Sequence, residues 1–188
     1  RKAYIEESVE EAVADYGNAV LYSSARNSYM IVRMKRMLER TVWALTEQLS
    51  AGDFEPSAYE LRFENGKIDR IDTCEEQDAV YVKVLDYKTG MKAFDVTALY
   101  NGLQLQLMVY MDAAVRAWQK KRLDKEIIPA GVFYYRIQDP FVDKQEEDAK
   151  EAILKELKPD GIVNLQKDAL SHLERGLQGE SLAVPVKL

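Results

Sequence analysis

Two ionic side chains end the apolar face of a predicted β-strand. Residues 80–88, VYVKVLDYK, are rich in β-branched residues, which favours a strand over a helix. Because side chains alternate across a strand, three valines share one face with Asp86 and Lys88. A strand that becomes charged on its core-facing side near its end is either entering solvent or building a functional site.

The preceding predicted strand, residues 67–72, supplies a second carboxylate. A hairpin that turns near residues 76 and 77 places Asp69 nearly opposite Asp86. Two carboxylates across a ladder repel each other unless a positive charge lies between them. A divalent cation with oxygen ligands would resolve this repulsion, and the backbone carbonyl of Tyr87 is a further candidate ligand.

These groups together predict hydrolysis of a phosphodiester. A divalent metal polarises the phosphate and activates water, while Lys88, one pleat beyond Asp86, stabilises the charge that builds on the phosphoryl oxygens. The alternative is a surface ion pair between Asp86 and Lys88, contributing at most about 1 kcal/mol. The D-x-K tripeptide alone leaves both interpretations open.

Composition narrows the class of protein. The net charge of -6 argues against a basic surface that binds nucleic acid through Lys and Arg alone, so nucleic-acid binding would need divalent metal to supply positive charge locally. The single cysteine, Cys74, can form neither an internal disulfide nor a cluster of four thiolates, which fits a reducing, cytoplasmic setting. No apolar run approaches the roughly 20 residues that cross a membrane. We expect one domain over residues 1–188, cut from a larger protein.

The periodicities predict an α/β fold. Residues at helical spacing predict helices at 5–21, 27–52 (capped by Asn27), about 98–121, 146–157 and 166–177. Alternating or β-branched residues predict strands at 58–63, 67–72, 80–88 and 132–137. The first of these strands places Tyr59, Leu61 and Phe63 on its buried face. We expect a mixed sheet that begins with an antiparallel three-strand meander and continues through a buried helix to a further strand, flanked by helices.

Three linked motifs resemble the PD-(D/E)XK nuclease superfamily. They are GKIDRID, DYKTG and GLQLQLMVYMDAA, and PAGVFYYRIQDP continues the likeness, which covers about residues 54–140. Within the superfamily, the chain is similar to the nuclease domains of AddB (RexB-like) subunits of bacterial helicase-nucleases. The resemblance implies a restriction-endonuclease-like core, DNA as substrate, Mg²⁺ or Mn²⁺ as cofactor, and a helicase-nuclease partner subunit.

The resemblance also implies roles for particular residues. It makes Asp69 and Asp86 metal ligands, Lys88 the catalytic lysine, and Gln106 and Tyr110 the Q-x-x-x-Y motif of the family. The last two are spaced i, i+4 on one helix face, although a core helix with two satisfied polar residues would look the same.

Other polar residues near the motifs are weaker candidates. Glu60 is a possible further metal ligand, because related nucleases carry an acid nearby. Candidates for holding DNA phosphates are Lys67, Arg70 and Lys92. Asp72 is a rival to Asp69, but we expect it to be a solvated residue on the opposite strand face.

Two features of the family are missing from the sequence. Many relatives have a metal-binding histidine upstream of the sheet, whereas the only histidine here, His172, lies in the last predicted helix and is expected at the surface. The cysteines of the iron-sulfur cluster found in AddB-type proteins do not occur, so we expect no such cluster in this chain, and Cys74 is interpreted as an exposed thiol.

The expected function is that of a metal-dependent DNA exonuclease, the nuclease module of a helicase-nuclease in double-strand-break repair and recombination. No G-x-x-x-x-G-K-[ST] string occurs, so ATP hydrolysis is not expected of this chain. The alternative is a catalytically silent nuclease fold that serves as a scaffold or guides DNA in the same kind of complex.

Overall fold

The computed structural model of the chain describes residues 2–16, 22–64, 66–90, 93–142 and 146–188. The helices are α1 (Lys2–Asp15), α3 (Ala25–Ser50), α4 (Val96–Tyr100), α5 (Gln106–Lys121), α6 (Glu146–Glu156) and α7 (Lys167–Leu173). The strands are β1 (Glu55–Phe63), β2 (Gly66–Glu75), β3 (Ala79–Lys88), β4 (Glu126–Arg136) and β5 (Asp160–Val163). None of these helices is long and apolar enough to cross a membrane.

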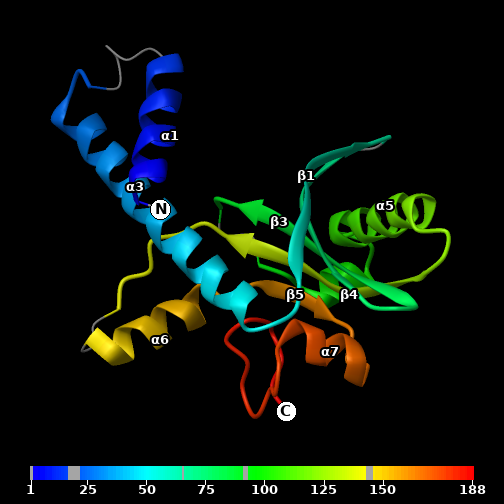
Figure 1. Cartoon of the computed structure of the whole chain (residues 1–188). Helices are drawn as coiled ribbons and strands as arrows, with labels where there is room; N and C mark the ends of the chain where they lie inside the picture. The colour runs from blue at the N-terminus through cyan, green and yellow to red at the C-terminus, as the bar shows by residue number, and fades with distance from the viewer. Residues whose placement is uncertain (1, 17–21, 65, 91–92, 143–145) are drawn as a thin grey trace.

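The five strands form one mixed sheet in the order β1-β2-β3-β4-β5 (Figure 1). The β1-β2 and β2-β3 pairs are antiparallel, β3 and β4 are parallel, and β5 is antiparallel to β4. The predicted α/β class and three-strand meander are confirmed. The sequence did not predict β5, because Pro159 and Gly161 indicated a break. A Cβ at Gly161 would lie 2.1 Å from the carbonyl oxygen of Val132, so the glycine lets β5 approach β4 closely.

The parallel pair β3-β4 requires a crossover, and α4 and α5 form it. The prediction of one helix over 98–121 was wrong: α4 ends at Tyr100 and α5 begins at Gln106. Gly102, with φ of 74°, lies between them in a conformation that ends a helix. The break matters because it makes Gln106 the first residue of α5 rather than an interior one.

Helices and loops cover both faces of the sheet, which explains why β3 is apolar along most of its length. One face packs against α5, and its core includes Ile71, Val82, Val84, Leu107, Ala114 and Trp118. The other packs against α7 and the C-terminal segment, and its core includes Phe54, Cys74, Tyr81, Phe133, Leu173 and Val184.

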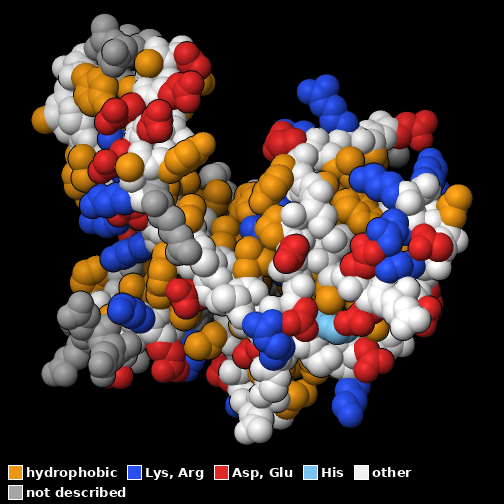
Figure 2. Space-filling model, viewed as in Figure 1, with side chains coloured by type: hydrophobic (Ala, Val, Ile, Leu, Met, Phe, Trp, Pro, Cys, Tyr) orange, Lys and Arg blue, Asp and Glu red, His pale blue; other side chains and the backbone are white. Residues whose placement is uncertain are grey.

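Helix α1 and the first half of α3 form an arm that projects from the sheet (Figure 1). Val9, Val13 and Ile31 form its small core. Helix α3 begins earlier than expected, because the cap is Ser24, whose Oγ accepts a hydrogen bond from the Asn27 N–H at 3.2 Å. On the face shown in Figure 2, acidic side chains gather over α1, where the sequence runs EESVEE from residue 6.

Candidate active site

Strands β2 and β3 pair in the register that the sequence predicted for this hairpin. Arg70 pairs with Leu85 at the end of the regular ladder. The same register, continued by one step beyond the paired residues, would set Asp69 opposite Asp86. The predicted hairpin register is confirmed, and the role of the two aspartates as metal ligands stays a prediction.

The alternation of side chains breaks where β1 and β2 pass Asp69. Ile68 and Ile71 both belong to the core under α5 although they are three residues apart. Across the ladder, Glu60 has a left-handed backbone, with φ of 53°, which is uncommon outside glycine and marks a local irregularity. Tyr59 was expected to be buried, but it is 63% exposed, because the irregularity turns it away from the core.

The irregularity leaves the Asp69 carboxylate free to reach β3. Its Oδ2 accepts a hydrogen bond from the backbone N–H of Tyr87 at 2.8 Å, where a ladder bond would otherwise form. On the other side of β3, the carbonyl of Lys88 accepts from the N–H of Ile137 at 2.9 Å. Adjacent residues of a strand direct their backbone groups to opposite sides, so the Tyr87 carbonyl points toward β2 and Asp69.

Asp86 and Lys88 form an ion pair on the α5 side of β3. The Asp86 side chain is 4% exposed and that of Lys88 is 22% exposed, so the interpretation as a solvated surface pair is wrong. The ammonium also lies 5.3 Å from the ring centre of Tyr134 on β4, whose aromatic face attracts a cation. Sequence reasoning did not single out Tyr134, although the parallel pairing sets it beside Asp86.

The first turn of α5 joins this pair. Lys88 Nζ donates a hydrogen bond to Gln106 Oε1 at 3.2 Å, and Gln106 Nε2 donates to the Tyr110 hydroxyl at 2.8 Å. Tyr110 is held edge-on against Phe63 of β1, with ring centres 5.7 Å apart. Contacts thus run without interruption from Asp86 through Lys88 and Gln106 to Tyr110, which links the D-x-K and Q-x-x-x-Y motifs.

Two weaker candidates pair with each other near the site. Glu60 lies across the β1-β2 ladder from Asp69, but its exposed carboxylate forms an ion pair with the exposed Lys67. A role for Glu60 with metal and for Lys67 with phosphate stays a prediction. Lys92 lies outside the described residues.

Arg70 and Asp72 differ most from expectation. Arg70 is 4% exposed and Asp72 is fully buried, both on the sheet face opposite Lys88. The guanidinium of Arg70 donates to both Asp72 oxygens, at 2.6 and 3.0 Å, and Lys83 Nζ lies 3.1 Å from the same carboxylate. Asp72 is therefore not solvated, and Arg70 is enclosed in a buried ion cluster rather than flanking the candidate active site.

Comparison with known proteins agrees with this arrangement. A family model described as the PD-(D/E)XK nuclease superfamily matches residues 1–187. Similar curated proteins are named as subunits of an ATP-dependent helicase/deoxyribonuclease. The one from Lachnoclostridium phytofermentans is 43% identical over 93% of this chain and 16% of its own length. Those from Alkaliphilus metalliredigens and Clostridioides difficile are 34% and 36% identical over 98% and 96% of this chain, and 18% of theirs. The chain thus spans less than a fifth of the relatives it matches.

Proposed function

This chain belongs to the PD-(D/E)XK nuclease superfamily, and we propose that it hydrolyses phosphodiester bonds of DNA as the metal-dependent nuclease module of a helicase-nuclease. The observation that carries the proposal is the run of contacts Asp86–Lys88–Gln106–Tyr110, in which two separate motifs of the superfamily converge. The relatives' names add DNA as the substrate and a helicase-nuclease as the setting.

The acidic side of the site suits a hard divalent cation. The register of β2 and β3, continued by one step, sets Asp69 opposite Asp86, and the Tyr87 carbonyl is directed toward β2, so that the candidate donors are all oxygens. Oxygen donors are the ligands that Mg²⁺ and Mn²⁺ prefer. When bound, the ion would lower the pKa of a water and polarise the scissile phosphate.

Lys88 is the group that stabilises developing negative charge in this proposal. Its ammonium is held by three neighbours, the Asp86 carboxylate, the Gln106 amide and the ring of Tyr134. A preorganised cation of this kind needs no rearrangement when charge builds on the phosphoryl oxygens. Asp69, tied to the Tyr87 N–H, holds β2 against β3 at this point.

Replacing Asp86 by asparagine tests the proposal. We expect the parent chain to degrade end-labelled linear DNA only with Mg²⁺ or Mn²⁺ and the variant to be slowed at least about 100-fold. Asp112→Asn is the matched control, because this exposed residue of α5 pairs with Arg116 one turn away. Equal residual cutting by all three proteins would point to a contaminant and favour the silent scaffold.

Exonuclease action is a finer part of the same proposal. The parent should degrade linear duplexes from their ends while leaving covalently closed circles intact. Cutting both substrates at similar rates would contradict an exonuclease and leave the metal-dependent chemistry standing. We propose that in the full complex this module works beside the helicase segments of a longer chain and a partner subunit. The complex would act in the repair of double-strand breaks.

Gln106 serves as a positioning residue for Lys88. We expect Gln106→Ala to lower kcat about 10-fold with little change in the affinity for Mn²⁺, because the amide holds the ammonium and not the acids. Single-turnover cleavage and Mn²⁺ titration measure the two quantities. Gln119→Ala, on the exposed side of α5, is the control, and a variant as fast as the parent would remove Gln106 from the site.

A further inference from the structure

A cluster of side chains of the types that ligate metals lies on the sheet face opposite Lys88. Cys74 near the end of β2, Glu76 directly after that strand, and His172 in the last turn of α7 each offer one ligand atom, and these atoms lie within 4.8 Å of one another. The histidine is far from the other two in the sequence, so only the packing of α7 on the sheet brings the three together.

Neither Cys74 nor His172 is the surface residue that the sequence suggested. Cys74 is 6% exposed and belongs to the core under α7, and the His172 side chain is 15% exposed. The ring of Tyr81, which pairs with Cys74 across the β2-β3 ladder, lies 4.8 Å from the imidazole between ring centres. The thiol and the imidazole are therefore held in place by the fold.

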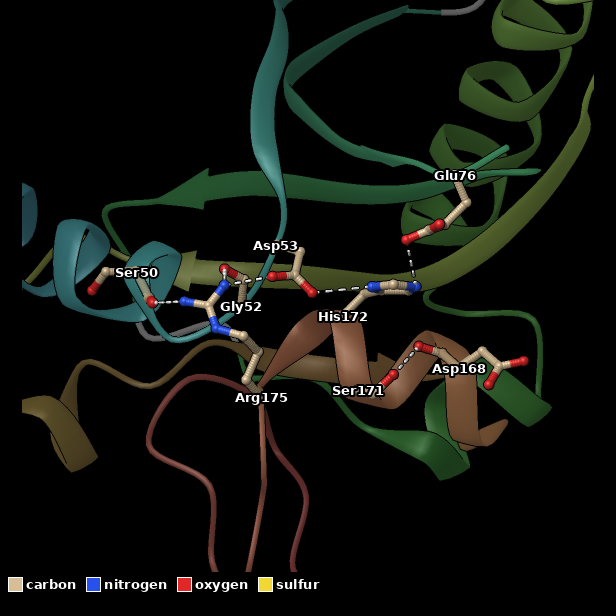
Figure 3. A network of polar contacts seen from close by, with 8 residues as sticks. All are labelled: Ser50, Gly52, Asp53, Glu76, Asp168, Ser171, His172 and Arg175. Atoms are coloured by element: carbon tan, nitrogen blue, oxygen red, sulfur yellow. Dashed lines mark hydrogen bonds and ion pairs between the residues drawn. The ribbon is translucent and has the colours of Figure 1, made fainter. Parts of the chain in front are cut away.

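The imidazole sits between two carboxylates (Figure 3). Its Nδ1 lies 3.1 Å from Asp53 Oδ2, and its Nε2 lies 3.6 Å from Glu76 Oε1. Asp53 is fixed in turn by an ion pair with Arg175 and by its backbone N–H, which donates to the His172 carbonyl at 2.8 Å. Histidine ligands of metals commonly carry a carboxylate on the ring nitrogen that does not bind, and Asp53 is placed to do this while Nε2 faces Glu76.

The donors and the charge of the cluster favour one class of metal. Sulfur, nitrogen and oxygen donors together suit Zn²⁺ and similar transition-metal ions, whereas Mg²⁺ takes oxygen donors. Burial, with the nearby carboxylates of Asp53, Glu76 and Glu55, raises the pKa of the Cys74 thiol to about 11. A divalent cation bound here would displace the thiol proton.

We propose that Cys74, Glu76 and His172 form a binding site for Zn²⁺ or a similar divalent transition-metal ion, distinct from the oxygen site at Asp69 and Asp86. Water completes the fourth position, while Asp53 holds the imidazole through its other nitrogen. The bound ion ties the last turn of α7 to the end of β2 and so closes the fold on the side away from the nuclease site.

Cobalt titration of the whole chain tests this site directly. Cys74 is the only cysteine in the sequence, so a thiolate-to-Co²⁺ charge-transfer band in the near ultraviolet can come from no other residue, even if Co²⁺ also enters the nuclease site. We expect one equivalent of Co²⁺ to produce the band, Zn²⁺ to abolish it by displacement, and saturating Zn²⁺ to raise Tm by about 5 °C.

Variants distinguish a site with three protein ligands from binding of Co²⁺ by the thiol alone. Glu76→Gln and His172→Gln keep the thiol, and each should weaken Co²⁺ binding by about 10-fold or more, whereas Asp86→Asn should leave the band unchanged. Glu55→Gln is the matched control, because Glu55 is an acid near Cys74 that is not one of the three ligands. The proposal would be overturned if the parent showed no band, or if Glu76→Gln and His172→Gln bound Co²⁺ as tightly as the parent.

Discussion

Replacing Lys88 by methionine is expected to slow DNA cleavage by about 100- to 1000-fold while the affinity for Mn²⁺ stays near that of the parent. Methionine preserves much of the length and the apolar stem of the side chain and removes the ammonium that contacts Asp86, Gln106 and the ring of Tyr134. The loss should therefore fall on kcat rather than on the binding of metal or DNA. Single-turnover cleavage at saturating Mn²⁺ measures it.

Lys121→Met is the matched control for this variant. Lys121 Nζ also lies over an aromatic ring, 4.3 Å from the centre of Trp118, but on the last turn of α5 and away from Asp86. It should cleave at the parental rate. If Lys88→Met cut DNA as fast as Lys121→Met, the ammonium would not be part of the chemistry, and the proposed mechanism would fail at its central group.

Replacing Asp72 by asparagine is expected to destabilise the fold by about 3–5 kcal/mol and to lower Tm by about 10 °C. Asp72 is fully buried and is the carboxylate that Arg70 and Lys83 share. Burial lowers the pKa of Lys83, and Asp72 opposes that shift. Without the carboxylate, two buried cations lose the anion that they share. Thermal and urea unfolding measure the effect.

The control for Asp72→Asn is again Asp112→Asn, which removes an exposed pair and should change stability by less than about 0.5 kcal/mol. A triple variant that replaces Arg70, Asp72 and Lys83 by apolar residues of similar volume should recover much of the loss, because none of the three buried charges remains. If Asp72→Asn were as stable as the parent, the prediction would be wrong, and water would have to reach the buried cluster.

The central geometry of the site could be predicted from the sequence because it is local. Residues 67–88 form one hairpin, and a short turn leaves few registers, so the register that pairs Arg70 with Leu85 follows from chain length alone. The spacing of Gln106 and Tyr110 likewise needs only the helical repeat. The structure adds that Gln106 accepts a hydrogen bond from Lys88 and donates one to Tyr110.

The features that could not be predicted depend on distant segments or on backbone irregularity. Asp72 and Cys74 look like polar residues of a hairpin, and they are buried because the C-terminal part of the chain covers that face. The left-handed backbone at Glu60 changes which residues of β1 and β2 face the core. A glycine at this position would have indicated such a conformation, but the residue is a glutamate. Strand β5 depends on β4 as a template, since four residues carry little period of their own.

The projecting arm is connected to the candidate active site through the segment after β4. Helix α3, with 26 residues, is about 39 Å long. Near its middle, Arg36 and Arg40 form ion pairs with Asp139, three residues beyond the end of β4. These ion pairs hold α3 to the segment that follows β4, the strand next to β3 and Lys88. In the same segment the Ile137 N–H donates to the Lys88 carbonyl, so that polar contacts join the helix of the arm to the strand that carries the candidate catalytic lysine.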